Sequence, residues 1–326
     1  MNILAWNVRG LGSASKRATI KDTITSLCPD IVILSETKSS SINNKFIKSL
    51  WSSISIAWAS LDASGASGGI ILLWDQLSTS AVEVICGHFS ISVHFKLADN
   101  FTWWLTGVYS PVKQKKRKLF WQELFDLNGL CGPIWLLGED FNIYRWSHET
   151  SSANPPQTGM NKFNHFIDFA GLIDPFMNNG QYTWSNLRPH IVLSRINRFL
   201  YSKGWSDKFS HHHIKRLPRA CSDHYPILLE PPNQQWGHCP FRLENLWLQD
   251  KHFQQHIEAI WSSGSSDGYL GYALIKKLNT LAQDIKRLRK NFGPNIPREK
   301  AKIMEKILSI DKQEETGFID KTDCHL

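Results

Sequence analysis

Polar side chains that could hold a cation or move a proton stand at the ends of apolar runs in this sequence. They are Asn7, Glu36, Asp140 and Asn142, each after such a run, and Ser222, Asp223 and His224, which precede one. Carboxylate and amide oxygens suit Mg²⁺, which needs only one or two protein carboxylates beside phosphate and water. A neighbouring histidine suits proton transfer or stabilisation of phosphate charge. Each residue alone is typical of a turn or a helix cap, so the recurrence at strand ends is what indicates a site.

The elements that must position these residues alternate between short β-rich runs and helical periodicity. Helices are expected at 15–27, 42–51, 115–127 and 161–169. Strands are expected at 3–8, 31–35, 54–59, 69–74, 81–86, 89–95, 102–109, 134–137, 182–184, 194–201 and 225–230. The chain therefore opens as a βαβα unit and continues as antiparallel meanders joined by Ser/Gly and Asp-Asn turns. A layered α/β sandwich of two mixed sheets is the simplest architecture that buries these faces.

Composition excludes several classes of protein. The chain has 326 residues, 42% hydrophobic and 20% charged, so it can bury a large core and is neither a disordered tail nor a small disulfide scaffold. A net charge of +8 and an isoelectric point near 9.1 favour polyanionic partners, such as nucleic acid or a phosphoester. Six isolated cysteines without a secretory leader indicate a reducing, intracellular compartment. No apolar run approaches the roughly 20 residues of a membrane span, so we expect no membrane partner.

A domain boundary is predicted at 231–235, where two prolines and aperiodic polar residues are typical of a linker. It would separate a domain at 1–230 from a helical region at 231–326. Apolar residues between 274 and 292 recur at spacings of four and three, which predicts a helix ended by Pro294 and Pro297, with another helix around 303–310. Basic residues flank this seam, so the region is either a helical appendage that packs on its neighbour or a basic arm that contacts nucleic acid.

Seven short motifs occur in the order of a known superfamily. They are WNVRGLG at 6–12, LSETK at 34–38, VYSP at 108–111, GEDFN at 138–142, YTWSN at 182–186, SRINRFL at 194–200 and SDHYP at 222–226. The series resembles the endonuclease/exonuclease/phosphatase superfamily, the DNase I-like fold, over residues 1–230. Within it, the chain resembles the apurinic-type endonuclease of plant LINE-type non-LTR retrotransposons. The resemblance implies a four-layered α/β sandwich, with two mixed β-sheets packed face to face, helices outside, and a C-terminal helical extension.

The resemblance also implies a reaction and a role for each motif residue. Glu36 would bind Mg²⁺, with Mn²⁺ as an alternative, and Asn7 would help to hold metal and scissile phosphate. Asp140 would activate the attacking water, while Asn142 would fix Asp140 and the phosphate. The remaining site residues are Tyr109 as a phosphate contact, Asn197 as the partner of the histidine, and Asp223 and His224, which complete the site, with Asp223 counted among the metal ligands. The reaction would be metal-assisted attack of water on a DNA phosphodiester, giving 5′-phosphate and 3′-hydroxyl ends.

A second set of residues is expected to contact DNA. Its members lie in the motifs or in the basic cluster that follows Tyr109, and they are Arg9, Lys38, Lys115, Lys116, Arg117, Trp184, Asn186 and Ser222. The basic cluster at 113–118 could grip phosphates, serve as a nuclear-import signal, or simply be the solvated start of a helix. Import would make the protein nuclear. Residues 240–247 resemble the segment that leads to a reverse transcriptase, the partner domain of a full-length relative, which we do not expect within this chain.

Two residues depart from the family pattern. Asn197 stands where the family has an Asp that orients the catalytic histidine, and it can offer either its carbonyl oxygen or its amide. By analogy with a Ser-His-Asp triad, loss of that charge costs up to about 10⁴-fold in rate. Glu139 stands where the family has a glycine, and it would cost roughly 1 kcal/mol or more if that position has a positive φ.

These departures predict a weakened or inactive nuclease, so two other functions stay open. One is a catalytically inactive nucleic-acid-binding relic of a retroelement, which would bind DNA in a salt-dependent way without cutting it. The other is a phosphatase of the same superfamily, which the basic residues disfavour. We expect a Mg²⁺-dependent DNA endonuclease of retrotransposon origin.

Overall fold

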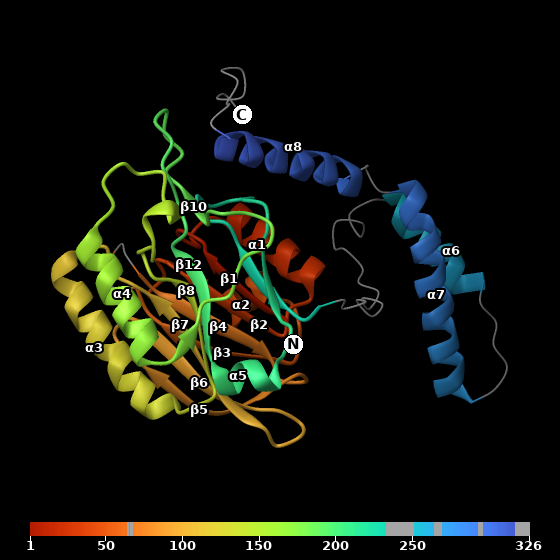
Figure 1. The fold of residues 1–326 in the computed structure, drawn as a ribbon. Coiled ribbons are helices and arrows are strands. Elements are labelled where there is room, and N and C mark those ends of the chain that lie inside the picture. The colour runs from red at the N-terminus through yellow and green to blue at the C-terminus, as the bar shows by residue number, and fades with distance from the viewer. Residues whose placement is uncertain (64, 66–67, 233–250, 264–268, 293–295, 317–326) are drawn as a thin grey trace. The chain divides into compact units, whose positions relative to one another are not determined.

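The computed structural model describes residues 1–63, 65, 68–232, 251–263, 269–292 and 296–316 (Figure 1). Contacts divide these residues into two units. The first unit comprises the described residues up to 232 together with 307–316, and the second comprises the described residues between 251 and 306. All of the predicted site residues lie in the first unit.

One six-stranded sheet of the first unit has the strand order β13-β14-β1-β2-β4-β3. Its strands are β1 (Ile3–Asn7), β2 (Ile31–Ser35), β3 (Ile56–Leu61), β4 (Ile70–Asp75), β13 (His213–Arg216) and β14 (Ile227–Glu230). β1 and β2 are parallel, and every other pair is antiparallel. The helices α1 (Ala14–Leu27) and α2 (Asn44–Leu50), N-capped by Ser13 and Asn43, pack their buried isoleucines against one face of this sheet.

The second six-stranded sheet has the order β5-β6-β7-β8-β12-β9. Its strands are β5 (Ser80–Cys86), β6 (Ser90–Lys96), β7 (Thr102–Tyr109), β8 (Trp135–Asp140), β9 (Leu172–Ile173) and β12 (Asn197–Ser202). Only β7 and β8 are parallel. The helices α3 (Gln114–Cys131) and α4 (Gln157–Phe169) cover its outer face through an aromatic-rich cluster. A short helix η1 (Ser147–Glu149), a helix α5 (Lys203–Lys208) and a small sheet of β10 (Trp184–Ser185) and β11 (Leu193–Ser194) complete the unit.

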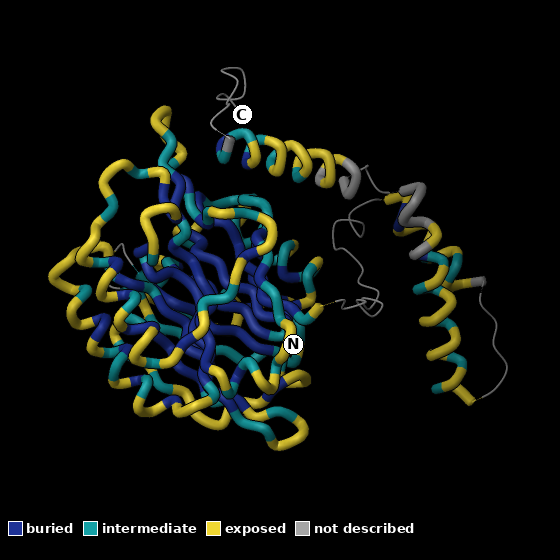
Figure 2. The backbone as a smooth tube through the Cα atoms, in the orientation of Figure 1, coloured by how far each residue is buried: buried dark blue, intermediate teal, exposed yellow. Residues whose placement is uncertain are grey.

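The two sheets face each other across a core that contains residues of both. Ile33, Leu72, Phe95, Leu105 and Phe199 belong to this core, and each is fully buried. Figure 2 shows the buried strands at the centre and the more exposed helices around them. The layers are therefore helix, sheet, sheet, helix, which confirms the predicted DNase I-like sandwich.

Several predicted elements differ in their bounds, for local reasons. The run at 134–137 continues to Asp140 as β8, so this carboxylate is the last residue of a strand rather than part of the following turn. The predicted strand 194–201 is divided between β11 and β12, and at the break the backbone N–H groups of Ile196 and Asn197 both donate to the Thr183 hydroxyl. The short elements β9, β13, α5 and η1 were not predicted, since runs of two to six residues carry little periodicity.

The C-terminal region is helical, as predicted. In the second unit, α6 (Lys251–Ser263) and α7 (Leu270–Phe292) pack together, and Lys277 lies over the Trp261 ring at 5.5 Å. Pro297 is the second residue of α8 (Ile296–Thr316), where its missing N–H costs nothing, whereas Pro294, residues 233–235 of the predicted linker and residues 240–247 lie outside the described residues.

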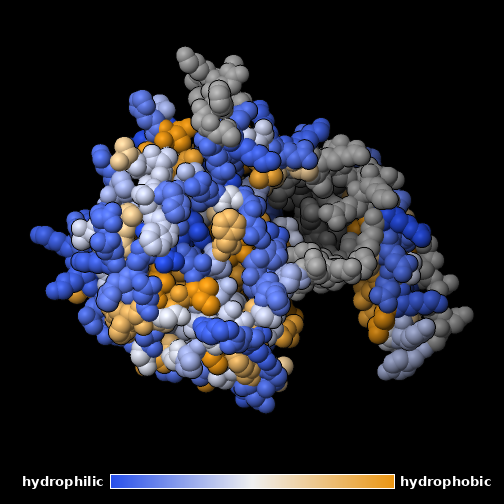
Figure 3. Space-filling view, viewed as in Figure 1, coloured by the Kyte–Doolittle hydropathy of each residue, from blue (hydrophilic) through white to orange (hydrophobic). Residues whose placement is uncertain are grey.

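The last turns of α8 belong to the first unit and carry acidic residues to it. Asp311 and Glu314 each lie 2.7 Å from the Arg219 guanidinium, which stacks on the Tyr225 ring. In the described part of the chain, no helix is both long and apolar enough to cross a membrane. The visible face of the first unit is mostly hydrophilic, with hydrophobic residues in separate patches (Figure 3).

Candidate functional site

The site lies where strands of both sheets end. Asn7 and Ser35 are paired in register at the ends of the parallel strands β1 and β2, so Asn7 and Glu36 lie at the same edge. In the other sheet, Tyr109 and Asp140 are paired in register at the ends of β7 and β8. Parallel pairing therefore delivers two polar residues from each sheet, as the recurrence at strand ends predicted.

Asp140 is held by hydrogen bonds from both sides. Its Oδ2 accepts from the Asn7 amide at 2.8 Å, and its Oδ1 accepts from the Asn142 backbone N–H at 2.8 Å. Asn142 in turn donates its side-chain amide to the Ser110 carbonyl at 2.7 Å. Burial, together with the negative charges of Glu36 and Asp223, raises the pKa of Asp140 to about 7 although these hydrogen bonds oppose the shift. Asp140 is thus poised to exchange a proton near neutral pH.

The loop before β14 is tied to β1. The Ser222 hydroxyl donates to the Asn7 carbonyl at 2.7 Å and accepts from the His224 backbone N–H at 3.2 Å. The Trp6 indole donates to the His224 carbonyl at 3.2 Å. These bonds hold Ser222, Asp223 and His224 beside Asn7, although the two segments are more than 200 residues apart in sequence.

Asp223 forms an ion pair with Arg9, and its Oδ2 also accepts from the Trp184 indole at 2.9 Å. The Oδ2 atom of Asp223 is therefore already paired with a protein cation, the Arg9 guanidinium. The half-buried Trp184 ring lies 6.4 Å from the His224 ring, so these two side chains border each other at the site.

His224 contacts Asn197 on its Nδ1 side. The Asn197 carbonyl oxygen lies 2.9 Å from His224 Nδ1, and the Asn197 amide donates to Glu139 Oε1 at 3.1 Å. Asn197 thus offers its carbonyl to the histidine, the first of the two orientations that the sequence left open. Burial lowers the pKa of His224 to about 4, so the imidazole is neutral at physiological pH.

Glu139 has a φ of +104°, in the region that favours glycine. This confirms the strained backbone that its departure from the family pattern predicted, at a cost of about 1–3 kcal/mol. Its carboxyl group is fully buried and accepts hydrogen bonds from Asn197 and from the Ser35 hydroxyl. Burial and the charge of Asp140 raise the pKa of Glu139 well above its ordinary value.

Tyr109 and Glu36 lie near each other, and both are only partly buried. Burial, followed by the charges of Glu36 and Asp140, raises the pKa of Tyr109 far above its usual range, so its hydroxyl remains a hydrogen-bond donor. Glu36 is half-buried and pairs with Lys38 at 3.1 Å. Tyr109 also lines a cavity of about 280 Å³ together with Lys113 and Lys116.

The residues expected to contact DNA fall into two groups. Arg9, Lys38, Lys115 and Lys116 are exposed, and Trp184 and Ser222 are half-buried within the site. Arg117 instead donates to the carbonyls of Pro111 and Asn142, at 3.1 and 2.7 Å. Asn186 accepts from the Val192 N–H at 3.0 Å and closes its own loop. Arg117 and Asn186 therefore have structural contacts that the sequence did not indicate.

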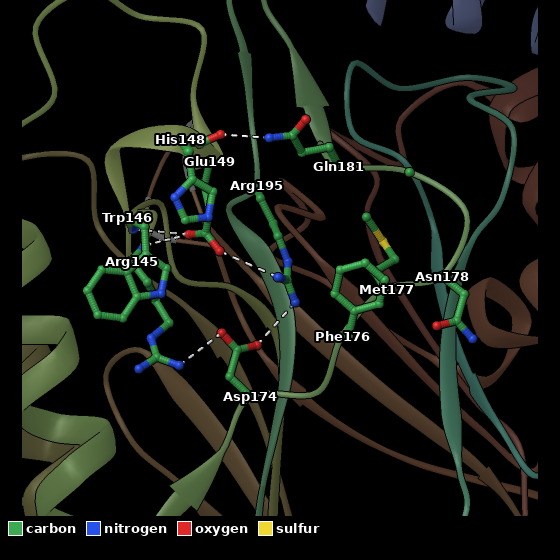
Figure 4. A pocket seen from close by; sticks show the side chains of 11 residues that line it. Arg145, Trp146, His148, Glu149, Asp174, Phe176, Met177, Asn178, Gln181 and Arg195 are labelled. Carbon is green, nitrogen blue, oxygen red and sulfur yellow. Dashed lines mark hydrogen bonds and ion pairs between the residues drawn. The ribbon is translucent and has the colours of Figure 1, made fainter.

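A second cavity, of about 510 Å³, lies beside an ion-pair network (Figure 4). Arg195 lies 3.4 Å from Glu149 and 3.1 Å from Asp174, and Arg145 lies 3.3 Å from Asp174. The fully buried Arg198 binds both acids as well. Because Arg198 directly follows Asn197 in β12, the network anchors the strand that presents Asn197. Sequence reasoning missed it, since the partners are 21 to 49 residues apart and follow no motif.

Residues 4–224 match the model of the Endonuclease/Exonuclease/phosphatase family. The chain belongs to this family. Among solved structures, the AP endonuclease LMAP from Leishmania major is similar with a TM-score of 0.57 at 14% identity, covering 70% of this chain and 86% of that chain. An AP endonuclease from Archaeoglobus fulgidus gives 0.54 at 15% identity, covering 71% and 99%.

The endonuclease domain of TRAS1, a telomere-specific non-LTR retrotransposon, has the same fold. Its TM-score is 0.53 at 12% identity, and the match covers 72% of this chain and 99% of that chain. At such low sequence identities, similarity to these solved structures shows only that the fold is shared. The function has to be argued from the residues of the site.

The oxygen donors at this site are few, but they are of the kind that a divalent cation prefers. The described residues contain no group of three or more His, Cys, Asp and Glu side chains arranged around one point. Mg²⁺ requires fewer, since one or two carboxylates with water and phosphate suffice. Glu36 and Asp140 raise the pKa of Tyr109 through their negative charge, and Glu36 also raises that of Asp140. The charges of both carboxylates therefore act on Tyr109, and their oxygens are of the kind that a hard cation prefers.

Proposed function

We propose that this protein is a Mg²⁺-dependent DNA endonuclease. The observation that carries the proposal is the hydrogen-bonded chain from His224 through Ser222 and Asn7 to Asp140, which joins three segments far apart in sequence. This chain supports the proposal because it links the loop of a neutral histidine to a carboxylate whose pKa is raised to about 7. A carboxylate and a histidine of this kind can take part in the proton transfers of phosphodiester hydrolysis.

Each side chain has a role in that reaction. Asp140, when ionised, accepts a hydrogen bond from the attacking water and takes up its proton as the new phosphorus–oxygen bond forms. The bond between phosphorus and the 3′-oxygen breaks, and the leaving 3′-oxygen takes a proton from solvent to become the 3′-hydroxyl. Tyr109 stays protonated and donates to a phosphate oxygen, and the neutral His224, whose Nδ1 donates to Asn197, accepts a hydrogen bond from water through Nε2. Asn142 holds Asp140 in place through its backbone N–H. Most of the acceleration comes from positioning and charge neutralisation.

Mg²⁺ would be held by Glu36, with the Asn7 side-chain oxygen nearby, and when bound it neutralises the charge that develops on the phosphate. Mn²⁺ is an alternative, since it prefers the same oxygen ligands. Asp223 is a weaker candidate ligand than the sequence suggested, because Arg9 and Trp184 already bind its Oδ2.

DNA is the proposed substrate because exposed basic residues lie near the site. Lys113 and Lys116 line the cavity that Tyr109 enters, and Lys115 is exposed on the same turn. The net charge of +8 supports a polyanionic substrate. These features disfavour the alternative of a phosphatase for a small phosphoester.

Origin from a plant LINE-type non-LTR retrotransposon is part of the proposal. It is supported by the seven motifs in order and by a fold shared with the endonuclease domain of TRAS1. In such an element, the cut would leave a 3′-hydroxyl that primes a reverse transcriptase, and the protein would act in the nucleus. The inactive relic is less favoured than the sequence alone suggested, because Asn197 offers His224 a carbonyl acceptor.

The test is nicking of supercoiled plasmid and of a duplex with one abasic site. Cutting in Mg²⁺ is expected, with loss of cutting in EDTA and in the variants His224→Ala and Asp140→Asn. The exposed variant Asp126→Asn is the matched control for the second substitution. A folded protein that binds DNA in a salt-dependent way and never cuts it would overturn the proposal in favour of the relic.

A further inference from the structure

Glu139 lies between the two sheets, where a regular strand would not place it. Gly138 and Asp140 face the opposing sheet, since a Cβ on Gly138 would meet Ile33 and Asp140 contacts Asn7. Alternation would turn Glu139 to the other face. Its φ of +104° breaks the alternation and directs the carboxyl group to Ser35 of the first sheet.

The buried carboxyl group there has two hydrogen-bond partners. Oε1 accepts from the Asn197 amide at 3.1 Å, and Oε2 pairs with the Ser35 hydroxyl, which donates to an ionised carboxylate and accepts from a protonated carboxyl group. Asn197 is 1% exposed, so water does not compete for its amide. Its backbone N–H donates to Thr183 at 3.0 Å, which fixes where the side chain begins.

An asparagine beside a histidine can turn either end toward it. With the amide toward Nδ1, the imidazole would have to accept there and carry its proton on Nε2. With the carbonyl toward Nδ1, the proton sits on Nδ1 and Nε2 keeps its lone pair. Glu139 Oε1 accepts a hydrogen bond, so it selects the second arrangement by holding the amide on the side away from His224.

We propose that Glu139 is a positioning residue, which fixes the amide of Asn197 so that His224 carries its proton on Nδ1 and presents an unprotonated Nε2. The two departures from the family pattern then act together, because Glu139 lets the neutral Asn197 orient the histidine as an aspartate would. The consequence for catalysis rests on the proposed endonuclease function, whereas the consequence for the imidazole does not.

The decisive variants are Glu139→Gly and Glu139→Gln. Glycine accepts the positive φ without strain and removes only the carboxyl group, so this variant is expected to fold. Glutamine keeps a carbonyl oxygen for Asn197, while its amide can donate to the Ser35 oxygen. Nicking of plasmid by Glu139→Gly is expected to fall at least about tenfold in kcat with little change in KM, and Glu139→Gln should stay within about threefold of the parent.

The double variant Glu139→Gly with Asn197→Asp restores the family pair and should recover the lost activity. Asn197→Asp alone should not raise activity, because it sets a second carboxyl group against Glu139. If Glu139→Gly cuts as fast as the parent, or if Glu139→Gln is as impaired as Glu139→Gly, Glu139 does not position Asn197.

A second readout separates this proposal from the proposed function. ¹⁵N NMR of labelled histidine, with His224→Gln to assign the signals, reports which ring nitrogen of His224 carries the proton. The parent and Glu139→Gln should hold the Nδ1-protonated form, and Glu139→Gly should shift toward a mixture. A parent protein that keeps this signature but never cuts DNA refutes the endonuclease and leaves the positioning role standing. An unchanged tautomer in Glu139→Gly refutes the positioning role itself.

Discussion

Asn7 at the end of β1 donates its side-chain amide to Asp140 at the end of β8, across 2.8 Å and between the two sheets. Both residues are fully buried, so water cannot replace this bond. The same Asn7 presents its backbone carbonyl to Ser222. One asparagine therefore fixes both the carboxylate and the loop that carries the histidine.

Replacement of this asparagine should move the pH dependence of the reaction. The amide of Asn7 lowers the pKa of Asp140, which burial raises to about 7, so Asn7→Ala should raise that pKa further. Nicking near neutral pH should fall about 10- to 100-fold and recover partly at higher pH. The measurement is a pH–rate profile, with the exposed variant Asn161→Ala as control. A slower enzyme whose profile keeps the parental midpoint would mean that Asn7 does not act through Asp140.

The sequence predicted the fold and placed the candidate site residues at strand ends, because both inferences depend on local patterns. Apolar runs located β1, β2 and β8, and the polar residues that follow them were correctly expected to gather. The partners within the site depend on contacts between distant segments. The orientation of Asn197 is decided by Glu139, which is 58 residues away and turned inward by a positive φ that no sequence period reveals. The hydrogen bond from Asn197 to Thr183, at the break in the predicted strand 194–201, could not be predicted either, because it also joins separate segments.

Stability of the metal-free protein should fall as pH rises from 6.5 to 8. Folding raises the pKa of Glu139 and of Asp140 above their unfolded values near 4, so the native state retains protons that the unfolded state has lost. The stability linked to these groups is complete below pH 4 and is lost as pH rises through their native pKa values. The lowered pKa of His224 acts only below about pH 6.5, where stability is lost as pH falls, so it does not interfere in this window.

Urea unfolding at pH 6.5, 7 and 8 measures this effect. The slope is at most about 1.4 kcal/mol per pH unit for each proton. Glu139→Gln removes one of the two titrating groups and should make the decline shallower, whereas Asp126→Asn at an exposed site should leave it unchanged. Equal slopes for the parent and Glu139→Gln would show that Glu139 is ionised in the native protein at these pH values.

Arg117 and Lys115 lie in the same turn of α3, but their substitution should affect different properties: stability for Arg117 and DNA binding for Lys115. The Arg117 guanidinium binds the carbonyls of Pro111 and Asn142, so Arg117→Ala should cost about 2–3 kcal/mol of stability and loosen the loop that holds Asp140. Lys115 is exposed, so Lys115→Ala should leave stability unchanged and weaken DNA binding, lowering the salt slope by about one. Urea unfolding and DNA binding over a salt series distinguish the two. The assignment fails if Arg117→Ala is as stable as Lys115→Ala.

Mg²⁺ alone should bind the protein without DNA and stabilise it. The negative charge of Glu36 and Asp223 contributes to the raised pKa of Asp140, and a bound cation would relieve that repulsion. At a Mg²⁺ concentration one hundred times Kd, the gain in stability is about 2.7 kcal/mol, which raises the melting temperature.

Glu36→Gln should abolish most of this shift because it removes the carboxylate charge while keeping the size of the side chain. Glu123→Gln, at a carboxylate that caps the start of β6 and is not a proposed ligand of the cation, should keep the full shift. If Glu36→Gln responds to Mg²⁺ as the parent does, the cation binds elsewhere and Glu36 is not its ligand.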